Sequence, residues 1–265
     1  MAGPDLQPRT SSGGEATQDS EGRWQLTIPE GPGGRYRLAQ LDDYTAARRR
    51  DALPWTPPVA LSLRARVSAP DLPGTWGFGW WNDPFSVQLG FGGSGRRLPA
   101  LPNAAWFFYA SPPNHLAFSG DHPAQGFLGA TFAAPRLPFP LLALGMPLLP
   151  LLAWPVTARL LRKLIGRIIT EDAQALDVDV SSWHTYELAW REDEVRFRID
   201  GETRFTTKVV PRGPLGLVLW IDNQYIAFPP DGRLRFGTAA NPEARLVLEE
   251  IRVTSRQHGF AKAGP

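Results

Sequence analysis

The sequence predicts an all-β protein, a jelly-roll β-sandwich made of two packed sheets. Apolar and polar residues alternate in several short runs, most clearly between Trp183 and Gly201, as expected of half-buried strands. The chain has 26 Gly and 27 Pro among 265 residues, which favours many turns and few long helices. Its 10 Trp and 14 Phe are enough to line one face of a sheet with aromatic side chains as well as fill a core.

The expected strands follow one another along the chain. Val59–Val67 reads VALSLRARV, with apolar residues at every second position. Ala104–Ala110 (AAWFFYA) is apolar on both faces and is expected in the interior of a sheet. Asp200-Gly201 is a hairpin turn signal. The other expected strands are Trp24–Ile28, Tyr36–Tyr44, the Trp-rich block Gly74–Gly93, Phe127–Phe132, Tyr186–Trp190, Val195–Ile199, Thr203–Thr207, Leu215–Ile221 and Leu246–Val253.

The pattern indicates a single sandwich domain over residues 23–254, interrupted by an apolar and helical insertion at 137–172. Residues 1–22 are polar and rich in Gly, Ser and Pro, and we expect a disordered leader there. Residues 255–265 are expected to be a C-terminal tail. The leader has no apolar stretch typical of a signal peptide, so a cytoplasmic location is expected, with membrane association as an addition if the insertion provides it.

The insertion has two parts. Leu137–Trp154 is almost wholly apolar but contains four prolines, which argues against a membrane-spanning helix. Val156–Ile169 has apolar residues at helical spacing with basic residues between them, and so predicts an amphipathic basic helix. Either its apolar face packs on the sandwich, or the helix lies on an anionic membrane surface or caps an apolar cavity. The residues proposed for the membrane or lid role are Leu160, Leu164, Ile168, Arg159, Arg162 and Lys163.

Composition narrows the function classes. There is no cysteine, which excludes disulfides, thiolate catalysis and cysteine metal sites. The net charge of +2 gives little support for a nucleic-acid partner. The four histidines have no short ligand spacing, so no metal is expected. The Gly90–Gly95 stretch is followed by Arg96-Arg97 rather than a Lys-Ser/Thr pair, so it is not a phosphate loop and no cofactor is expected.

The segment Trp183–Glu202 resembles one family closely. Laminarinase- and lichenase-like proteins of glycoside hydrolase family 16 contain a strand of the form W-H-T-Y-x-x-x-W, then a turn and a strand of the form I-x-F-Y-V-D-G. Here the segment reads WHTYELAWREDEVRFRIDGE. Thr75–Trp81 is similar to the family's W-P-A-x-W strand, and Gly213–Asp222 and Leu248–Val253 occur in the family's order. The resemblance implies a concanavalin A-like fold over roughly Arg23–Thr254, with the insertion outside it.

The same resemblance argues against the family's usual reaction. Family members carry their two catalytic carboxylates on one strand, as E-x-D-x-E or E-x-D-x-x-E, because alternate strand residues face the same side. The matching strand here is Asn103–Tyr109, which contains no Asp or Glu, and E-x-D-x-E occurs nowhere in the chain. Glu171-Asp172 is read as a solvated helix end. We therefore lean towards a protein that is not an enzyme.

The concave face is instead expected to be an aromatic site for a small apolar, amphiphilic or saccharide ligand. The expected ligand-binding residues are Trp80, Trp81, Asn82, Trp106, Phe108, Tyr109, Trp220 and Gln224. Asp83 and Asp222 are the only candidates for a catalytic acid, with strand-end turns as the alternative for both. The favoured function is non-hydrolytic binding of an apolar or amphiphilic molecule. A family-16 type enzyme or carbohydrate-binding protein, and an isomerase or cyclase with a single buried acid, stay open.

Overall fold

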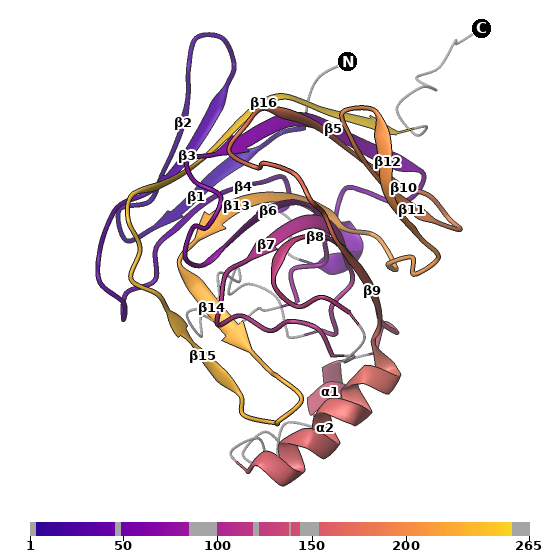
Figure 1. Ribbon diagram of the computed structural model, residues 1–265. Helices are drawn as coiled ribbons and strands as arrows, with labels where there is room; N and C mark the ends of the chain where they lie inside the picture. Colours follow the sequence, from indigo (N-terminus) through magenta and orange to yellow (C-terminus); the bar gives the residue numbers. More distant parts are fainter. Residues whose placement is uncertain are drawn as a thin grey trace, which may run out of the picture.

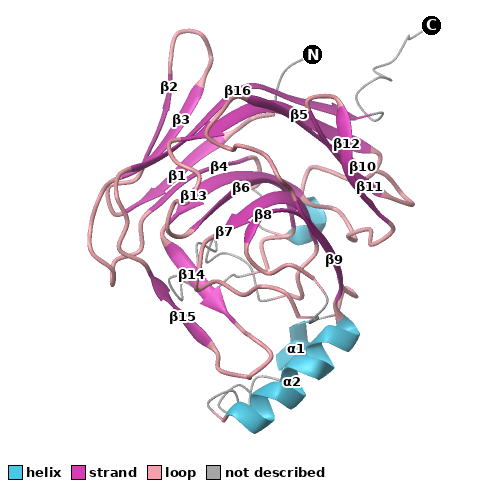
Figure 2. Ribbon diagram, in the orientation of Figure 1, coloured by secondary structure: helices cyan, strands magenta, loops and turns pink. Residues whose placement is uncertain are grey.

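The computed structural model describes residues 4–45, 49–84, 100–118, 122–137, 139–143 and 154–255. Two seven-stranded antiparallel sheets are packed face to face. In Figure 1 the first sheet lies between the second sheet above it and the β14–β15 hairpin and helix α2 below it. The predicted all-β sandwich is confirmed, and Figure 2 shows how little of it is helical.

The strands run in the following spatial order. The first sheet consists of β1 (Gln7–Ser11), β4 (Leu38–Asp42), β13 (Gly216–Asp222), β6 (Thr75–Trp81), β7 (Ala104–Ala110), β8 (Gly126–Ala133) and β9 (Thr170–Ala175). The second sheet consists of β12 (Glu202–Thr207), β11 (Val195–Ile199), β10 (His184–Trp190), β5 (Val59–Val67), β16 (Ala244–Ser255), β3 (Trp24–Ile28) and β2 (Glu15–Gln18). The remaining elements are a hairpin of β14 (Gln224–Ala227) and β15 (Arg235–Thr238), a short 3-10 helix (Arg50–Ala52), α1 (Phe139–Ala143) and α2 (Pro155–Ile168).

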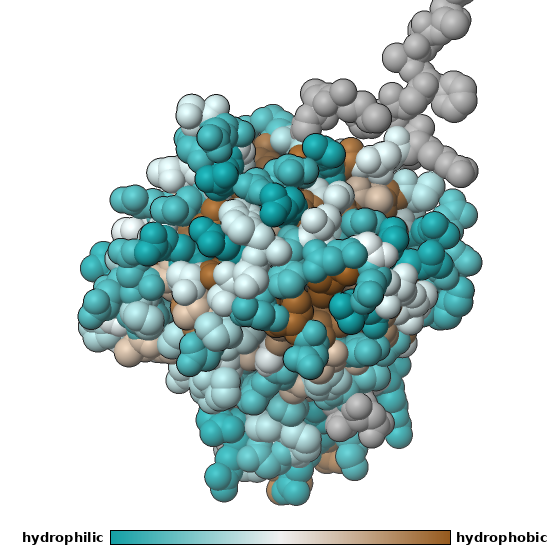
Figure 3. Space-filling view, turned by 45° about the horizontal axis from the view of Figure 1, so that its top comes forward, coloured by the Kyte–Doolittle hydropathy of each residue, from teal (hydrophilic) through white to brown (hydrophobic). Residues whose placement is uncertain are grey.

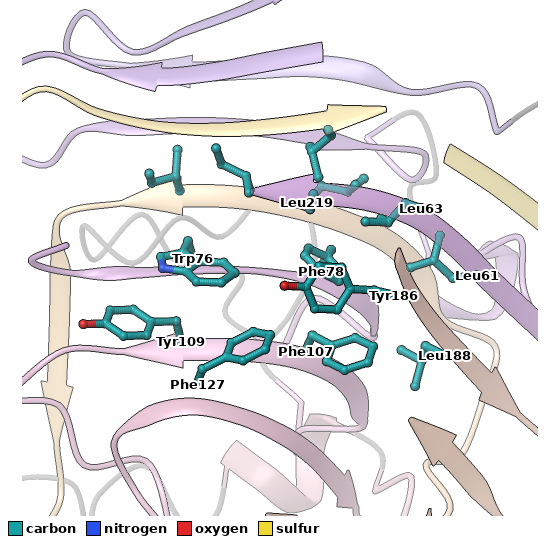
Figure 4. Packing of buried hydrophobic residues seen from close by; sticks show 14 of the residues in the cluster. Leu61, Leu63, Trp76, Phe78, Phe107, Tyr109, Phe127, Tyr186, Leu188 and Leu219 are labelled. Atoms are coloured by element: carbon teal, nitrogen blue, oxygen red, sulfur yellow. The ribbon is translucent and has the colours of Figure 1, made fainter. Parts of the chain in front are cut away.

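The core lies between the two sheets and is rich in aromatic residues (Figure 4). Every second residue of β5 is buried, as its sequence predicts. Phe107 of the first sheet meets Tyr186 and Phe197 of the second sheet edge-on, with ring centroids 5.2 Å apart in both pairs. β6 and β13 are buried on both faces, because the core covers one face and a second cluster covers the other.

The recognisable Trp183–Gly201 motif builds part of this fold. Tyr186, Leu188 and Trp190 point into the core from β10. His184 Nδ1 lies 2.6 Å from Asp200 Oδ2, and the other Asp200 oxygen accepts the Thr185 N–H. Asp200 and Gly201 both have positive φ angles, so they form the tight turn between β11 and β12. The residues that carry the family resemblance therefore pair and connect strands.

Several boundaries differ from the sequence expectation. Residues 7–18, expected to be part of a disordered leader, contain β1 and β2, so that expectation is wrong there. Both are polar edge strands, held in place by backbone pairing to β4 and β3. Because their residues are polar, they show no apolar alternation of the kind that reveals a half-buried strand. The stretch read as a solvated helix end is β9, which pairs with β8. The Gly90–Gly95 stretch and most of the expected tail lie outside the described residues.

The basic amphipathic helix is present as α2, but it is oriented in an unexpected way. Arg162, expected at a membrane or lid surface, is buried, whereas Leu160, Leu164 and Ile168 are exposed. The expectation that the apolar face packs on the sandwich is therefore wrong for Leu160, Leu164 and Ile168. Arg162 points inward because backbone carbonyl groups there accept its guanidinium hydrogen bonds. In the described part of the chain no helix is long and apolar enough to cross a membrane.

A glycine at the start of β6 allows strands β6 and β13 to meet. Gly74 has φ +109°, and a Cβ there would overlap the Asp222 carbonyl oxygen and come within 2.6 Å of Asn223 Cα. Gly126 also has a positive φ but has nothing within 4 Å of such a Cβ. Alanine at either position therefore costs about 1–2 kcal/mol of backbone strain. Only alanine at position 74 also overlaps the backbone of the neighbouring strand.

We expect Gly74→Ala to lower the free energy of unfolding by at least about 2 kcal/mol more than Gly126→Ala does, because the backbone of two strands must shift. Urea unfolding followed by tryptophan fluorescence measures both variants. Equal losses in the two variants would contradict the close approach of Gly74 to Asp222.

Candidate functional site

A pocket of about 170 Å³ lies on the face of the first sheet that is turned away from the core. Its floor comes from alternate residues of β4, β13, β6, β7 and β8. Its walls come from the loop residues around Leu116–Phe118 and from Ile226 of the β14–β15 hairpin. The aromatic and aliphatic lining residues include Tyr36, Leu38, Trp81, Trp106, Phe108, Leu116, Phe118, Leu128, Phe132, Val218, Trp220 and Ile226.

Aromatic rings on this face pack against one another around Trp106. Its ring centroid lies 5.5 Å from those of Phe108 and Trp220, and 6.0 Å from that of Trp81. Trp106 is half-buried, while Phe108, Trp220 and Trp81 are buried. The cluster is therefore a preformed apolar surface, and Trp106 is its most accessible ring among these four.

A carboxyl group, Asp222, stands at one end of this surface. Its Oδ1 accepts hydrogen bonds from the Thr75 hydroxyl at 2.8 Å and from the Gln224 backbone N–H at 3.1 Å. The Tyr36 hydroxyl donates to the other oxygen, Oδ2, at 3.4 Å. Trp220 Nε1 donates to the same Thr75 hydroxyl at 3.0 Å, which ties the aromatic cluster to the carboxyl. Burial raises the pKa of Asp222 to about 7, and hydrogen bonds from Thr75, Gln224 and Tyr36 oppose part of that rise.

Three further polar side chains at the pocket, Gln224, Trp106 and His122, make no hydrogen bond to a described residue, although His122 Nδ1 lies 3.8 Å from Asp172 Oδ1. The Gln224 side chain is 6% exposed and lines the pocket, and its amide makes no hydrogen bond to any described residue. The buried Nε1–H of Trp106 likewise finds no acceptor in the described part of the chain. By contrast, Asn82, Asn103 and Asn114 line the pocket but use their amides to hold backbone groups. The free hydrogen-bonding capacity is thus small and belongs to a few groups.

The structure brings most of the sequence-predicted residues to one place. Trp81, Asn82, Trp106, Phe108, Trp220, Gln224 and Asp222 all line the pocket. Trp80 and Tyr109 do not, because they occupy the strand positions that face the core, where Figure 4 shows Tyr109 beside Trp76. Those two assignments are corrected.

Asp83, the other candidate acid, does not line the pocket either. It is fully buried directly after β6, its φ is +46°, and its backbone carbonyl accepts a hydrogen bond from Arg50 at 2.6 Å. Asp is one of the few residue types that tolerate this left-handed conformation, which fits a backbone role for Asp83 at the strand end. Of the two carboxyls singled out in the sequence, Asp222 alone reaches the pocket.

Sequence reasoning missed several lining residues, notably Tyr36, Thr75 and Glu171. Glu171 lies on β9 and accepts the Phe118 backbone N–H at 3.0 Å. Its strand was hidden because TEDAQA has no apolar alternation. Tyr36 sits just before β4, and only its distance from Asp222 identifies it.

The two described carboxyls that line the pocket, Asp222 and Glu171, lie far apart on the sheet. Asp222 is in register with Thr75 of β6, whereas Glu171 is in register, through β8 and β7, with Trp81 of β6. At about 3.3 Å per residue, these rows are about 20 Å apart along the strands. A glycosidase that uses two catalytic carboxyl groups needs them about 5–9.5 Å apart. No group of three His, Asp or Glu side chains in the described residues has the geometry of a metal site.

Comparison with known proteins supports the fold. No protein-family model and no curated protein matches the sequence. Among solved structures, a legume lectin-like domain from Entamoeba histolytica matches with a TM-score of 0.50 and 8% identity, covering 94% of this chain and 89% of that one. A β-glucanase from Bacillus licheniformis has a TM-score of 0.47 and 10% identity over 94% of this chain and 92% of that one. A glycoside hydrolase family protein from Mycobacterium thermorestibile has a TM-score of 0.46 and 15% identity, covering 90% of this chain and 79% of that one.

At these identities the similarity concerns the fold alone. The chain has a concanavalin A-like jelly roll, as the WHTY segment implies, and the fold is confirmed. β7 carries Ala104, Trp106 and Phe108 on the pocket face, where the sequence resemblance leads us to look for carboxylates.

The raised pKa of Asp222 makes a pH-dependent contribution to stability. An unfolded Asp has a pKa of about 3.9, so between about pH 4 and 7 the folded protein holds a proton that the unfolded chain has released. This contribution therefore falls as pH rises through that window. We expect Asp222→Asn to remove it, so that the variant gains stability relative to the parent protein from pH 4 to pH 7, as measured by urea unfolding.

Asp43 provides an independent comparison, because burial also raises its pKa to about 7 and it does not line the pocket. Asp43→Asn should show the same trend, and the double variant a larger one. A stability difference that stays constant from pH 4 to 8 in Asp222→Asn would contradict the assignment.

Proposed function

We propose that the protein binds one small amphiphilic molecule in this pocket without hydrolysing it. The observation that carries the proposal is the Gln224 amide, which lines the same pocket as Asp222 and makes no hydrogen bond to a described residue. An amide that faces a pocket without a protein partner is available to donate and accept hydrogen bonds with a ligand. The rest of the surface offers apolar contact to the ligand's body.

The polar end of the ligand follows from the groups that it meets. Asp222 accepts hydrogen bonds, and Gln224 both donates and accepts, so a neutral hydroxyl satisfies both residues. A carboxylate at this end is disfavoured above pH 7, where Asp222 is ionised. The proposed ligand class is therefore an apolar ring system or chain with a terminal hydroxyl.

Three probes that share the naphthalene ring test this chemistry: 2-naphthol, naphthalene and 2-naphthoate, titrated at pH 8 while tryptophan fluorescence is recorded. We expect 2-naphthol to bind best and 2-naphthoate worst. Gln224→Leu should weaken 2-naphthol binding about 3- to 10-fold, the value of one hydrogen bond, while naphthalene binding stays the same or improves.

Gln174→Leu is the matched control, because Gln174 is exposed on β9 and does not line the pocket. It should bind all three probes as the parent protein does. Equal affinity for 2-naphthol and naphthalene in the parent protein, or equal losses in both glutamine variants, would rule out the proposed polar end.

A saccharide is the second candidate ligand. The half-buried Trp106 ring, with its unpartnered Nε1–H, is suited to stacking on a sugar ring, and the similarity to a legume lectin-like domain supports testing it. A sugar, however, carries hydroxyls all around its ring. The pocket asparagines that would meet them already bind backbone groups. The amphiphile accounts better for a pocket whose free polar groups are few.

Cellobiose and laminaribiose distinguish the two candidates and also test for hydrolysis. We expect no saturable binding of either disaccharide by calorimetry. We also expect no release of reducing ends from mixed-linkage β-glucan, because β7 provides no carboxylate on the pocket face. Micromolar disaccharide binding that is lost in Trp106→Ala would favour the saccharide. Hydrolysis lost in Asp222→Asn would favour an enzyme.

A further inference from the structure

Helix α2 presents its apolar side outward. Arg162 is buried and donates hydrogen bonds to the Phe228 carbonyl at 2.9 Å and to the Ala117 carbonyl at 2.7 Å. Ala158, one turn earlier, is fully buried on the same side. These two residues fix the rotation of the helix about its axis. The opposite side consequently faces away from the sandwich.

That outward side is a continuous apolar stripe. Val156, Leu160, Leu164 and Ile168 follow one another at intervals of four residues, and they are 62%, 63%, 51% and 39% exposed. Trp154, just before the helix, is 60% exposed. Exposing so much apolar surface on one helix is unfavourable in water, which marks the stripe as an interaction surface. The face shown in Figure 3 is largely hydrophilic, with a hydrophobic area near its middle.

A row of cations runs beside the stripe. Arg159, Lys163 and Arg167 each precede one of its residues and are exposed. None of the three forms an ion pair with a described residue, so their charges are uncompensated in that part of the chain. A surface with an exposed apolar stripe beside a row of cations is complementary to a partner with an apolar interior and a negatively charged surface.

We propose that α2 docks the protein on an anionic lipid bilayer, with the stripe in the acyl–headgroup boundary and the three cations at the lipid phosphates. Trp154 at the start of the helix suits the same boundary, where indole rings are favoured. A second copy of this chain fits the surface less well, because apposed stripes bring two sets of the same three cations together.

The docking surface is adjacent to the pocket. The segment Leu116–Phe118 lines the pocket and also accepts the Arg162 hydrogen bond through the Ala117 carbonyl. Figure 1 places α2 and the β14–β15 hairpin at the same end of the molecule, and Ile226 of that hairpin is a pocket wall. A protein docked through α2 therefore holds its pocket close to the lipid. This inference does not depend on what the pocket binds.

Vesicle flotation with the full chain tests the proposal, using vesicles of phosphatidylcholine alone or with about 30 mol% phosphatidylserine. We expect binding to the anionic vesicles that weakens with salt. Leu160→Gln/Leu164→Gln should reduce it at least 10-fold, because it removes the apolar contact. Arg159→Gln/Lys163→Gln/Arg167→Gln should reduce it about 100-fold, at roughly fivefold per cation.

Arg191→Gln/Arg204→Gln/Arg252→Gln is the charge-matched control, because these exposed arginines lie on or beside the second sheet. It should bind anionic vesicles as the parent protein does. All substituted side chains are exposed, so thermal unfolding temperatures should change little. No binding to anionic vesicles, or equal losses in the α2 and control variants, overturns the proposal. Concentration-dependent dimerisation without vesicle binding, abolished by Leu160→Gln/Leu164→Gln, also overturns it in favour of a second copy.

Discussion

The central constraint on this molecule is that the middle strands of the first sheet are covered on both faces. Side chains alternate across a strand, so each of β6, β7 and β13 supplies one set of residues to the core and another to the pocket. Both sets are largely aromatic or aliphatic. On the pocket side, β7 carries Trp106 and Phe108, and these two rings make that side of the strand apolar. The position of the Asp222 carboxyl at one end then gives the pocket its polarity.

Much of this arrangement is predictable from sequence, because it follows from period-two patterns and from one motif. The WHTYELAW run identifies the fold through residues that fill the core and build a turn. The pattern also indicates an aromatic pocket with Asp222. It does not say which of two adjacent aromatic residues faces which side, and the assignments of Trp80 and Tyr109 failed for that reason.

What the sequence does not reveal is set by contacts between distant segments. Tyr36 and Thr75 reach Asp222 because β4 and β6 flank β13, a neighbourhood that no local pattern encodes. The polar strands β1, β2 and β9 are held by backbone pairing and have no apolar signature. The rotation of α2 is fixed by Arg162, whose partners are backbone carbonyls that carry no sequence signal. In each case hydrogen bonds between distant segments, and not the local hydrophobic pattern, determine the position of the element.

The proposed function requires that an amphiphilic molecule occupy the pocket with its polar end at Asp222. A crystal structure of protein purified without detergent or delipidation tests this most directly. We expect elongated density along Trp106 and Phe108, with a polar atom within hydrogen-bond distance of the Gln224 amide and of an Asp222 oxygen. A pocket filled by collapsed side chains, or a molecule whose polar end points away from Asp222, would contradict the account.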